Sequence, residues 1–118
     1  MDSHNIEVNA YYFLQYFNGE KEYMLRLYDG ENQHYQDRDV ICIEEKHTGR
    51  YFTGIITRLQ YFLYFDQVFE AIDYRKFGPE PQSKADAIEI YERNPDFQQA
   101  RELGLITFRI TRVSDIIE

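Results

Sequence analysis

The longest strand-like segment of the sequence, Tyr51 to Phe62, constrains the fold most strongly. It is rich in β-branched and aromatic residues, which favour strands. Alternate residues of an extended chain share a face, and Gly54 inside the segment predicts a bulge or a bend. One predicted face carries Tyr51, Thr53, Ile55, Thr57, Leu59 and Tyr61. A strand of this length needs a sheet around it, so other parts of the chain must supply neighbouring strands.

Shorter segments with strand-like patterns can fill that sheet. They are His4–Val8, Lys21–Leu27, Val40–Ile43 and Leu105–Val113. The pattern of the last segment predicts Ile106, Phe108 and Ile110 facing inward and Thr107, Arg109 and Thr111 facing outward. Glu45 to Arg50, with its Thr-Gly pair, predicts a hairpin turn, and the polar stretch Tyr28–Arg38 predicts a long loop.

One helix is expected between the first two strands. Asn9 can cap it, and Asn18-Gly19 can end it. Its apolar residues recur at helical spacing, which predicts a core-facing stripe of Ala10, Phe13, Leu14 and Phe17, with Tyr12, Gln15 and Tyr16 nearer solvent.

From residue 66 the apolar period changes from two to 3.6, with a stripe of Phe65, Val68, Phe69 and Ile72. Ser83 followed by Asp86 predicts the start of a helix that runs to Arg93, and Asn94-Pro95 predicts another start. We therefore expect one α+β domain over residues 1–118, with a helical insertion at about 66–103 before the last strand.

Composition excludes several classes of protein. The 118 residues carry 13 Lys and Arg against 21 Asp and Glu, a net charge of −8, which argues against unspecific DNA binding. The single cysteine, Cys42, sits in a buried strand pattern and cannot form an internal disulfide. No segment has the length or the pattern of a membrane span or a secretion signal, so we expect a cytoplasmic protein. The scattered histidines and the lack of a glycine-rich phosphate loop predict neither a metal site nor a cofactor.

The segment Gly19 to Arg26 carries the most specific pattern. A helix stop is followed directly by Lys21 and, five residues later, by Arg26, which together offer a point charge and a planar fork to a phosphate or carbonyl group. This segment resembles the Gly-x-Lys-x-x-Glu-x-Arg signature of ASCH domains, which have the PUA-like fold. The resemblance spans about residues 3–65 and 105–113, and it includes Asp37-Arg38-Asp39 leading into Val-Ile-Cys-Ile-Glu-Glu, where such domains carry Gly-Asp and a strand that ends in Glu. It is closest in character to small bacterial and phage relatives of ASCH.

The resemblance implies a twisted β-barrel with a packed N-terminal helix and a cleft at the motif. Two positions depart from the family pattern: Met24 replaces the motif Glu, and Arg38 replaces the usual Gly before Asp39. Some ASCH relatives hydrolyse acetylated cytidine with the motif Lys and a hydroxyl residue at the position of Met24. Because a thioether can neither attack nor donate a hydrogen bond, we expect no such amidohydrolase activity here.

The sequence therefore predicts a non-catalytic PUA-like module that binds short single-stranded RNA or a nucleotide at this motif. The candidate ligand-binding residues are Lys21, Arg26, Tyr12, Tyr16, Arg50 and Arg109, with Arg112 as a further phosphate contact. Ordinary surface charges on a barrel are the alternative for these cations. A protein-interaction module that docks through its acidic face and the 66–103 helices is the alternative for the whole domain, and the oligomeric state stays open.

Overall fold

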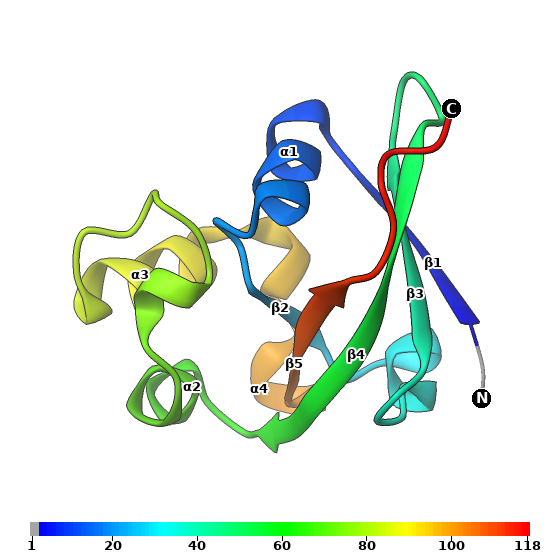
Figure 1. Ribbon diagram of the computed structural model, residues 1–118. Helices are drawn as coiled ribbons and strands as arrows, with labels where there is room; N and C mark the ends of the chain where they lie inside the picture. The colour runs from blue at the N-terminus through cyan, green and yellow to red at the C-terminus, as the bar shows by residue number, and fades with distance from the viewer. Residues whose placement is uncertain (1–2) are drawn as a thin grey trace.

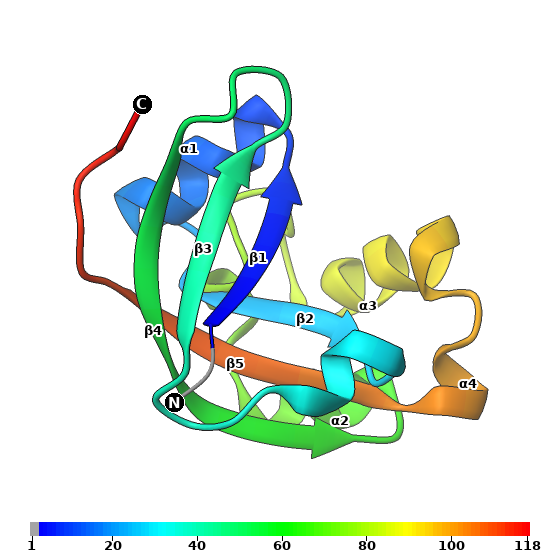
Figure 2. The ribbon, with the colours of Figure 1, turned by 90° about the vertical axis from the view of Figure 1, so that its right-hand side faces the viewer.

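The computed structural model describes residues 3–118, apart from the side chain of Glu31, and contains one mixed five-stranded sheet. The strands are β1 (Ser3–Val8), β2 (Tyr23–Leu27), β3 (Val40–Glu45), β4 (Tyr51–Phe62) and β5 (Leu105–Arg112). Their order across the sheet is β1-β3-β4-β5-β2, with β1 parallel to β3 and the other neighbours antiparallel. The sheet curls strongly, so that β2 and β5 run nearly across β1 and β3 (Figure 2). The expected α+β class is confirmed, and the expected twisted β-barrel takes the form of a curled half-barrel, consistent with the PUA-like fold.

The helix α1 (Ala10–Asn18) begins and ends where its sequence signals predict. The Asn9 side chain accepts a hydrogen bond from the Tyr12 amide at 2.8 Å, and Gly19 ends the helix with a φ of 82°. Its predicted burial is wrong at three positions, because Ala10 and Leu14 are exposed, Leu14 by 43%, whereas Gln15 is only 2% exposed. Gln15 is buried because its amide donates to the Glu80 carboxylate, in a segment far along the chain that covers this side of the helix.

The long strand β4 pairs with β3 on one side and with β5 on the other, which confirms its central role. Its irregularity is not at Gly54, as the sequence predicts, but between Thr57 and Gln60, where the register with β5 shifts. Gly54 instead allows a close approach, because a Cβ at this position would lie 2.8 Å from the Ile110 Cγ2 atom.

From Leu105 to Phe108 the strand β5 is buried on both faces. Ile106, Phe108 and Ile110 point into a core under α1, as predicted. The predicted outward position of Thr107 is wrong: this residue is fully buried, because the helices between β4 and β5 cover the other face of the strand. The molecule thus has two apolar cores, one on each side of β5.

The second core is built by the segment between β4 and β5, the predicted helical insertion. It contains α2 (Phe65–Ala71), α3 (Lys84–Arg93), α4 (Ala100–Leu103) and two 3-10 turns, η2 (Tyr74–Lys76) and η3 (Pro95–Phe97). Ser83 caps α3 through the Asp86 amide, as its pattern predicts. Figure 1 shows these helices gathered on the β2 side of the curled sheet, away from β1 and β3, with α1 above them.

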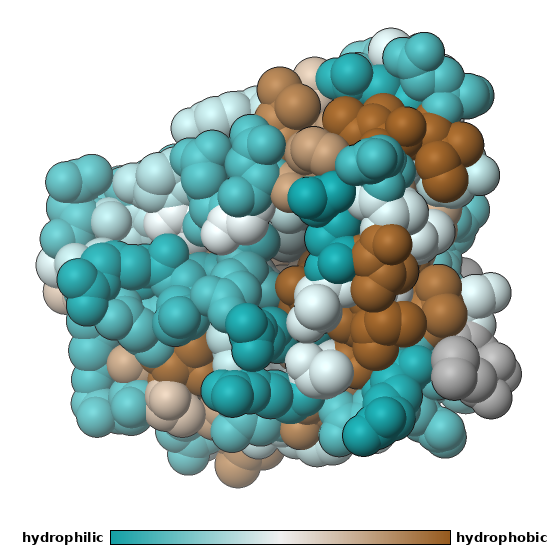
Figure 3. Space-filling model, viewed as in Figure 1, coloured by the Kyte–Doolittle hydropathy of each residue, from teal (hydrophilic) through white to brown (hydrophobic). Residues whose placement is uncertain are grey.

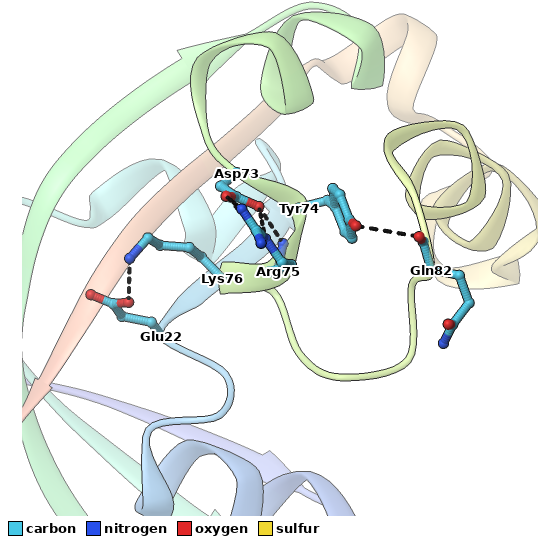
Figure 4. A network of polar contacts seen from close by, with 6 residues as sticks. All are labelled: Glu22, Asp73, Tyr74, Arg75, Lys76 and Gln82. Carbon is cyan, nitrogen blue, oxygen red and sulfur yellow. Dashed lines mark hydrogen bonds and ion pairs between the residues drawn. The ribbon is translucent and has the colours of Figure 1, made fainter.

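Polar contacts tie this insertion to the start of β2 (Figure 4). The Glu22 carboxylate pairs with Lys76 of η2 at 3.1 Å and with Arg109 of β5 at 2.7 Å. The Glu22 amide also donates to the Lys76 carbonyl, and the Tyr74 hydroxyl donates to the Gln82 carbonyl at 3.3 Å. These contacts hold the segment from η2 to α3 beside residues 21 and 22.

Among residues 3–118, no helix has both the length and the apolar character that crossing a membrane would require. The half-buried Cys42 lies on β3, and partial burial raises the pKa of its thiol.

Candidate functional site

A cleft of about 350 Å³ opens where α1, β2 and the insertion meet. One wall is the face of α1 that carries Tyr12 and Tyr16, and the floor is β2 from Met24 to Leu27. The opposite wall comes from the insertion, chiefly Tyr91 on α3 and Phe97 on η3. Three segments that are distant in sequence therefore build one cavity.

Lys21 lies deep in this cleft. The chain between α1 and β2 pairs there with the end of η2 through a Lys21–Phe77 bridge, and the two segments run side by side in Figure 1. The Lys21 ammonium donates to the Phe77 carbonyl at 2.5 Å. It also lies 4.9 Å from the centroid of the Tyr12 ring and 5.7 Å from that of Tyr16, within cation–π range. The site fixes the lysine through a carbonyl and two rings.

Two opposing influences act on the charge of Lys21. Burial lowers the pKa of its amine, and the nearby Glu80 carboxylate acts in the opposite direction. Among the side chains that the structure describes, no carboxylate lies within ion-pair distance of the Lys21 amine. Glu80 instead accepts a bond from Gln15 at 3.1 Å. An incoming anion or carbonyl oxygen would therefore meet a desolvated cation that has no carboxylate bound to it.

Arg26 reaches the same cleft from β2. Its Nε donates to the Asn32 side chain at 2.8 Å, and Asn32 in turn donates to Asp29 at 2.8 Å. One terminal nitrogen approaches the Met24 sulfur at 3.9 Å. These hydrogen bonds orient the Arg26 guanidinium, and the shortest of its contacts is made by Nε rather than by a terminal nitrogen. The terminal nitrogens are the groups that can meet a ligand.

The aromatic walls are neutral hydrogen-bonding surfaces. Burial raises the pKa of the Tyr16 and Tyr91 hydroxyls far above neutrality, and burial together with Glu80 raises the pKa of Tyr12. Tyr91 packs edge-on against Phe97, with ring centroids 5.3 Å apart. Protonated tyrosines of this kind offer flat faces and hydroxyl donors together.

Charges in the cleft almost balance. Lys21 and Arg26 stand against three carboxylates, those of Asp29, Glu80 and Asp96. This arrangement suits a ligand with one compact anionic group and polar edges better than a polyanion.

The structure brings together four of the six candidate residues, Tyr12, Tyr16, Lys21 and Arg26. The other two do not line the cleft. Arg50 pairs with Glu45 and lies over the Phe13 ring at 5.1 Å, while Arg109 pairs with Glu22. Arg112 also lies elsewhere, 4.2 Å from the centroid of the Phe17 ring.

Sequence reasoning missed the contribution of the insertion to the site. Tyr91, Phe97 and Glu80 line the cleft, but their sequence patterns indicate only helices for the first two and a short Pro-Glu-Pro linker for Glu80. Asn32, which orients Arg26, lies in the segment predicted as a loop, where the structure has the 3-10 turn η1 (Gly30–His34). Only tertiary packing brings these residues to the motif.

Comparisons with known proteins support the fold. No protein-family model and no curated protein sequence matches the chain. Solved structures do match. The hypothetical protein PH0355 superposes with a TM-score of 0.79 at 16% identity, over 94% of this chain and 99% of its own. Protein PF0455 from Pyrococcus furiosus gives 0.73 at 17% identity, over 98% and 100%.

A third structure carries the family name. A point mutant of the ZmASCH protein from Zymomonas mobilis gives a TM-score of 0.66 at 10% identity, over all of this chain and 74% of its own. The chain therefore has an ASCH-like fold, in agreement with its Gly19–Arg26 motif.

Proposed function

We propose that the cleft binds a nucleotide, either free or as an unstacked residue of short single-stranded RNA. The observation that carries this proposal is the convergence of Lys21 and Arg26 on one cavity walled by tyrosine rings. Flat aromatic faces stack on bases, and cationic nitrogens bind phosphate or base oxygens. The volume of about 350 Å³ lies in the usual range of small-molecule sites.

The two cations have different parts in this proposal. Arg26 presents a fork whose orientation is fixed by Asn32, so it can bind a phosphate or a base edge with two parallel bonds. Lys21 is buried beneath the tyrosine rings and contributes charge at short range. Tyr12 is 39% exposed at the mouth and is the more accessible of the two α1 tyrosines for contact with a base.

We propose binding without catalysis. Met24 is 3% exposed and lies at the motif position where acetylcytidine-hydrolysing relatives carry a hydroxyl residue. Its thioether offers no hydroxyl nucleophile, and burial raises the pKa of Tyr16 and Tyr91 further above the ordinary value of 10.0, which keeps the phenolate form out of reach. Purified protein should not hydrolyse acetylated cytidine, and turnover that Lys21→Ala abolishes would contradict this.

The test is a titration of nucleoside monophosphates and a short RNA library against wild type and variants. Arg26→Ala should weaken binding by about 1–3 kcal/mol, because charge-assisted bonds are lost. Arg26→Lys should restore only part of the affinity, since a point charge cannot replace a fork. Arg50→Ala and Arg109→Ala are matched controls that remove a cation outside the cleft and should bind as wild type does.

Circular dichroism establishes that each variant is folded. No binding by wild type at millimolar nucleotide, or unchanged binding by both Lys21→Ala and Arg26→Ala, would reject the proposal. The protein-interaction module would then become the leading function.

A further inference from the structure

The floor of the cleft is the edge of a strand rather than its face. Four consecutive residues, Met24 to Leu27, line the cavity. Side chains of successive strand residues point to opposite faces, so only every second residue could line a cavity on one face. The cavity therefore meets β2 at its outer edge, where the backbone itself is accessible.

The hydrogen-bond pattern identifies which backbone groups point outward. At either end of the β2–β5 pairing, Glu22 accepts from the Ile110 amide and the Tyr28 amide donates to Gly104, both at 3.0 Å. Antiparallel partners exchange these bonds at every second residue, so Met24 and Arg26 bond to β5. The N–H and C=O groups of Leu25 and Leu27 therefore point away from β5, toward the cleft.

Within the described part of the chain, no side chain or other backbone bonds these outward groups of Leu25 and Leu27. Leu25 is only 6% exposed, so its N–H and C=O lie in a confined space where an unmet hydrogen bond is costly. Before β2 the edge is already closed, because the Glu22 amide donates to the Lys76 carbonyl at 2.9 Å.

Within the cleft the open stretch is limited to two outward-facing residues, Leu25 and Leu27, because Tyr23 does not line the cavity. A peptide that joins a sheet as an extra strand needs a longer free edge, because strands usually contain at least three residues and mostly five or six. A planar ring with a neighbouring donor and acceptor is short enough to pair with one or two backbone groups. Tyr12 and Tyr91, on the two walls, offer flat surfaces to such a ring.

We infer that the Leu25–Leu27 backbone edge reads the hydrogen-bonding edge of a nucleobase in this cleft. The inference rests on the proposed nucleotide function, and it names the backbone groups that would select the base. Arg26 then remains for the phosphate, and the recognised ligands are bases with a ring nitrogen beside an exocyclic oxygen or amino group. A ribose phosphate without a base lacks the groups that this edge reads.

Backbone recognition can be measured by NMR on the full ¹⁵N-labelled chain. The probes are the four ribonucleoside 5′-monophosphates, with ribose 5-phosphate as the control that has a phosphate but no base. At least one nucleotide should move the Leu25 or Leu27 amide proton downfield, and ribose 5-phosphate should not. Methylation of the pairing ring nitrogen, as in 3-methyluridine or 1-methyladenosine monophosphate, should weaken binding of that base at least tenfold.

The outcomes separate this inference from the proposed function. Saturable nucleotide binding that leaves both leucine amides unmoved, or that tolerates ring methylation, overturns the inference and leaves the nucleotide site standing. No binding of any of the four nucleotides at millimolar concentration rejects the proposed function and the inference with it. Arg26→Ala should bind more weakly and still show the amide shift at saturation.

Discussion

Arg38 holds a backbone conformation that arginine adopts at a cost. Its φ is 74°, in the left-handed region, at the position before Asp39 where the ASCH pattern has glycine. The conformation is kept because the Arg38 amide donates to the Ile56 carbonyl at 2.7 Å, which joins this turn to β4. The departure from the family pattern thus has a local energetic consequence.

Arg38→Gly should stabilise the protein. Relief of the left-handed strain is worth about 1–2 kcal/mol, and the larger entropy of glycine in the unfolded chain offsets about 0.5–1 kcal/mol of it. We expect a net gain of about 0.5–1 kcal/mol in the free energy of unfolding, measured with urea. Arg38→Ala removes the same side chain but keeps the strain, so it should leave stability nearly unchanged. Equal effects of the two variants would refute the backbone explanation.

Lys21 should leave a signature in the pH dependence of stability. Burial lowers the pKa of its amine below the unfolded value of 10.5, so the unfolded chain binds this proton more tightly. Stability therefore rises with pH between the folded and the unfolded pKa, by no more than about 1.4 kcal/mol per pH unit. In Lys21→Met this contribution is absent.

The measurement is urea unfolding of both proteins from pH 7 to 10, compared as a difference. The cleft tyrosines titrate in both proteins, so their contributions largely cancel. A wild-type curve that rises no more steeply than that of Lys21→Met would show that the amine is not destabilised by burial.

At the residue scale, the sequence predicts the part of the site that is local in the chain. Lys21 and Arg26 follow a glycine helix stop within one short motif, so their proximity to one turn is visible from spacing alone. Glu80 and Tyr91 are 59 and 70 positions beyond Lys21. Their arrival in the cleft depends on how α3 packs, and no local pattern encodes that packing.

At the scale of elements, β5 shows what a strand pattern can hide. Its alternation of apolar and polar residues indicates one solvent-facing side, yet Thr107 is fully buried between the two cores. Its hydroxyl has no hydrogen-bond partner within the described residues. A buried hydroxyl without a partner lowers the stability of the folded state, so the Thr107 hydroxyl itself is not needed for folding of the strand.

Thr107→Val should raise the free energy of unfolding by about 1 kcal/mol, because it removes the unmet hydroxyl and keeps the β-branched shape. Thr111→Val is the matched control on the same strand, since Thr111 is exposed and should change little. Urea or thermal unfolding of both variants gives the comparison. A loss of stability in Thr107→Val would mean that the hydroxyl has a partner and stabilises the core.

Helix boundaries are predictable here because their signals are local and chemical. Asn9 and Ser83 cap their helices through side-chain bonds, and Gly19 ends α1 in the left-handed conformation. Which side chains of each helix are buried is harder to predict. Gln15 is buried and Leu14 exposed because α1 packs against both the sheet and the segment around Glu80, and the second of these neighbours cannot be foreseen from the helix itself.

At the scale of the whole molecule, the net charge of −8 opposes the approach of any polyanion. Hydrophilic side chains cover most of the face shown in Figure 3, and the apolar ones gather mainly toward the side of the C-terminal segment. The lining of the cleft sets two cations against three carboxylates, so it is not a basic track. A ligand is therefore held by groups within a few ångström, and the distant carboxylates are screened beyond roughly 8 Å at physiological salt.

Salt dependence tests this picture of the molecule directly. Each phosphate neutralised on a single strand contributes a slope of about −0.7 to a plot of log affinity against log salt concentration. With Arg26 and Lys21 as the cations that line the cleft, we expect a slope between about −0.7 and −1.4 for a short single-stranded RNA. Duplex DNA of equal length should bind at least tenfold more weakly, because its phosphates reach the acidic surface before they reach the cleft.

Arg26→Ala should reduce the steepness of the slope by about 0.7, whereas Arg112→Ala, outside the cleft, should leave it unchanged. A slope of about −3 or steeper, insensitive to Arg26→Ala, would place the nucleic acid on another surface and reject the cleft as its binding site.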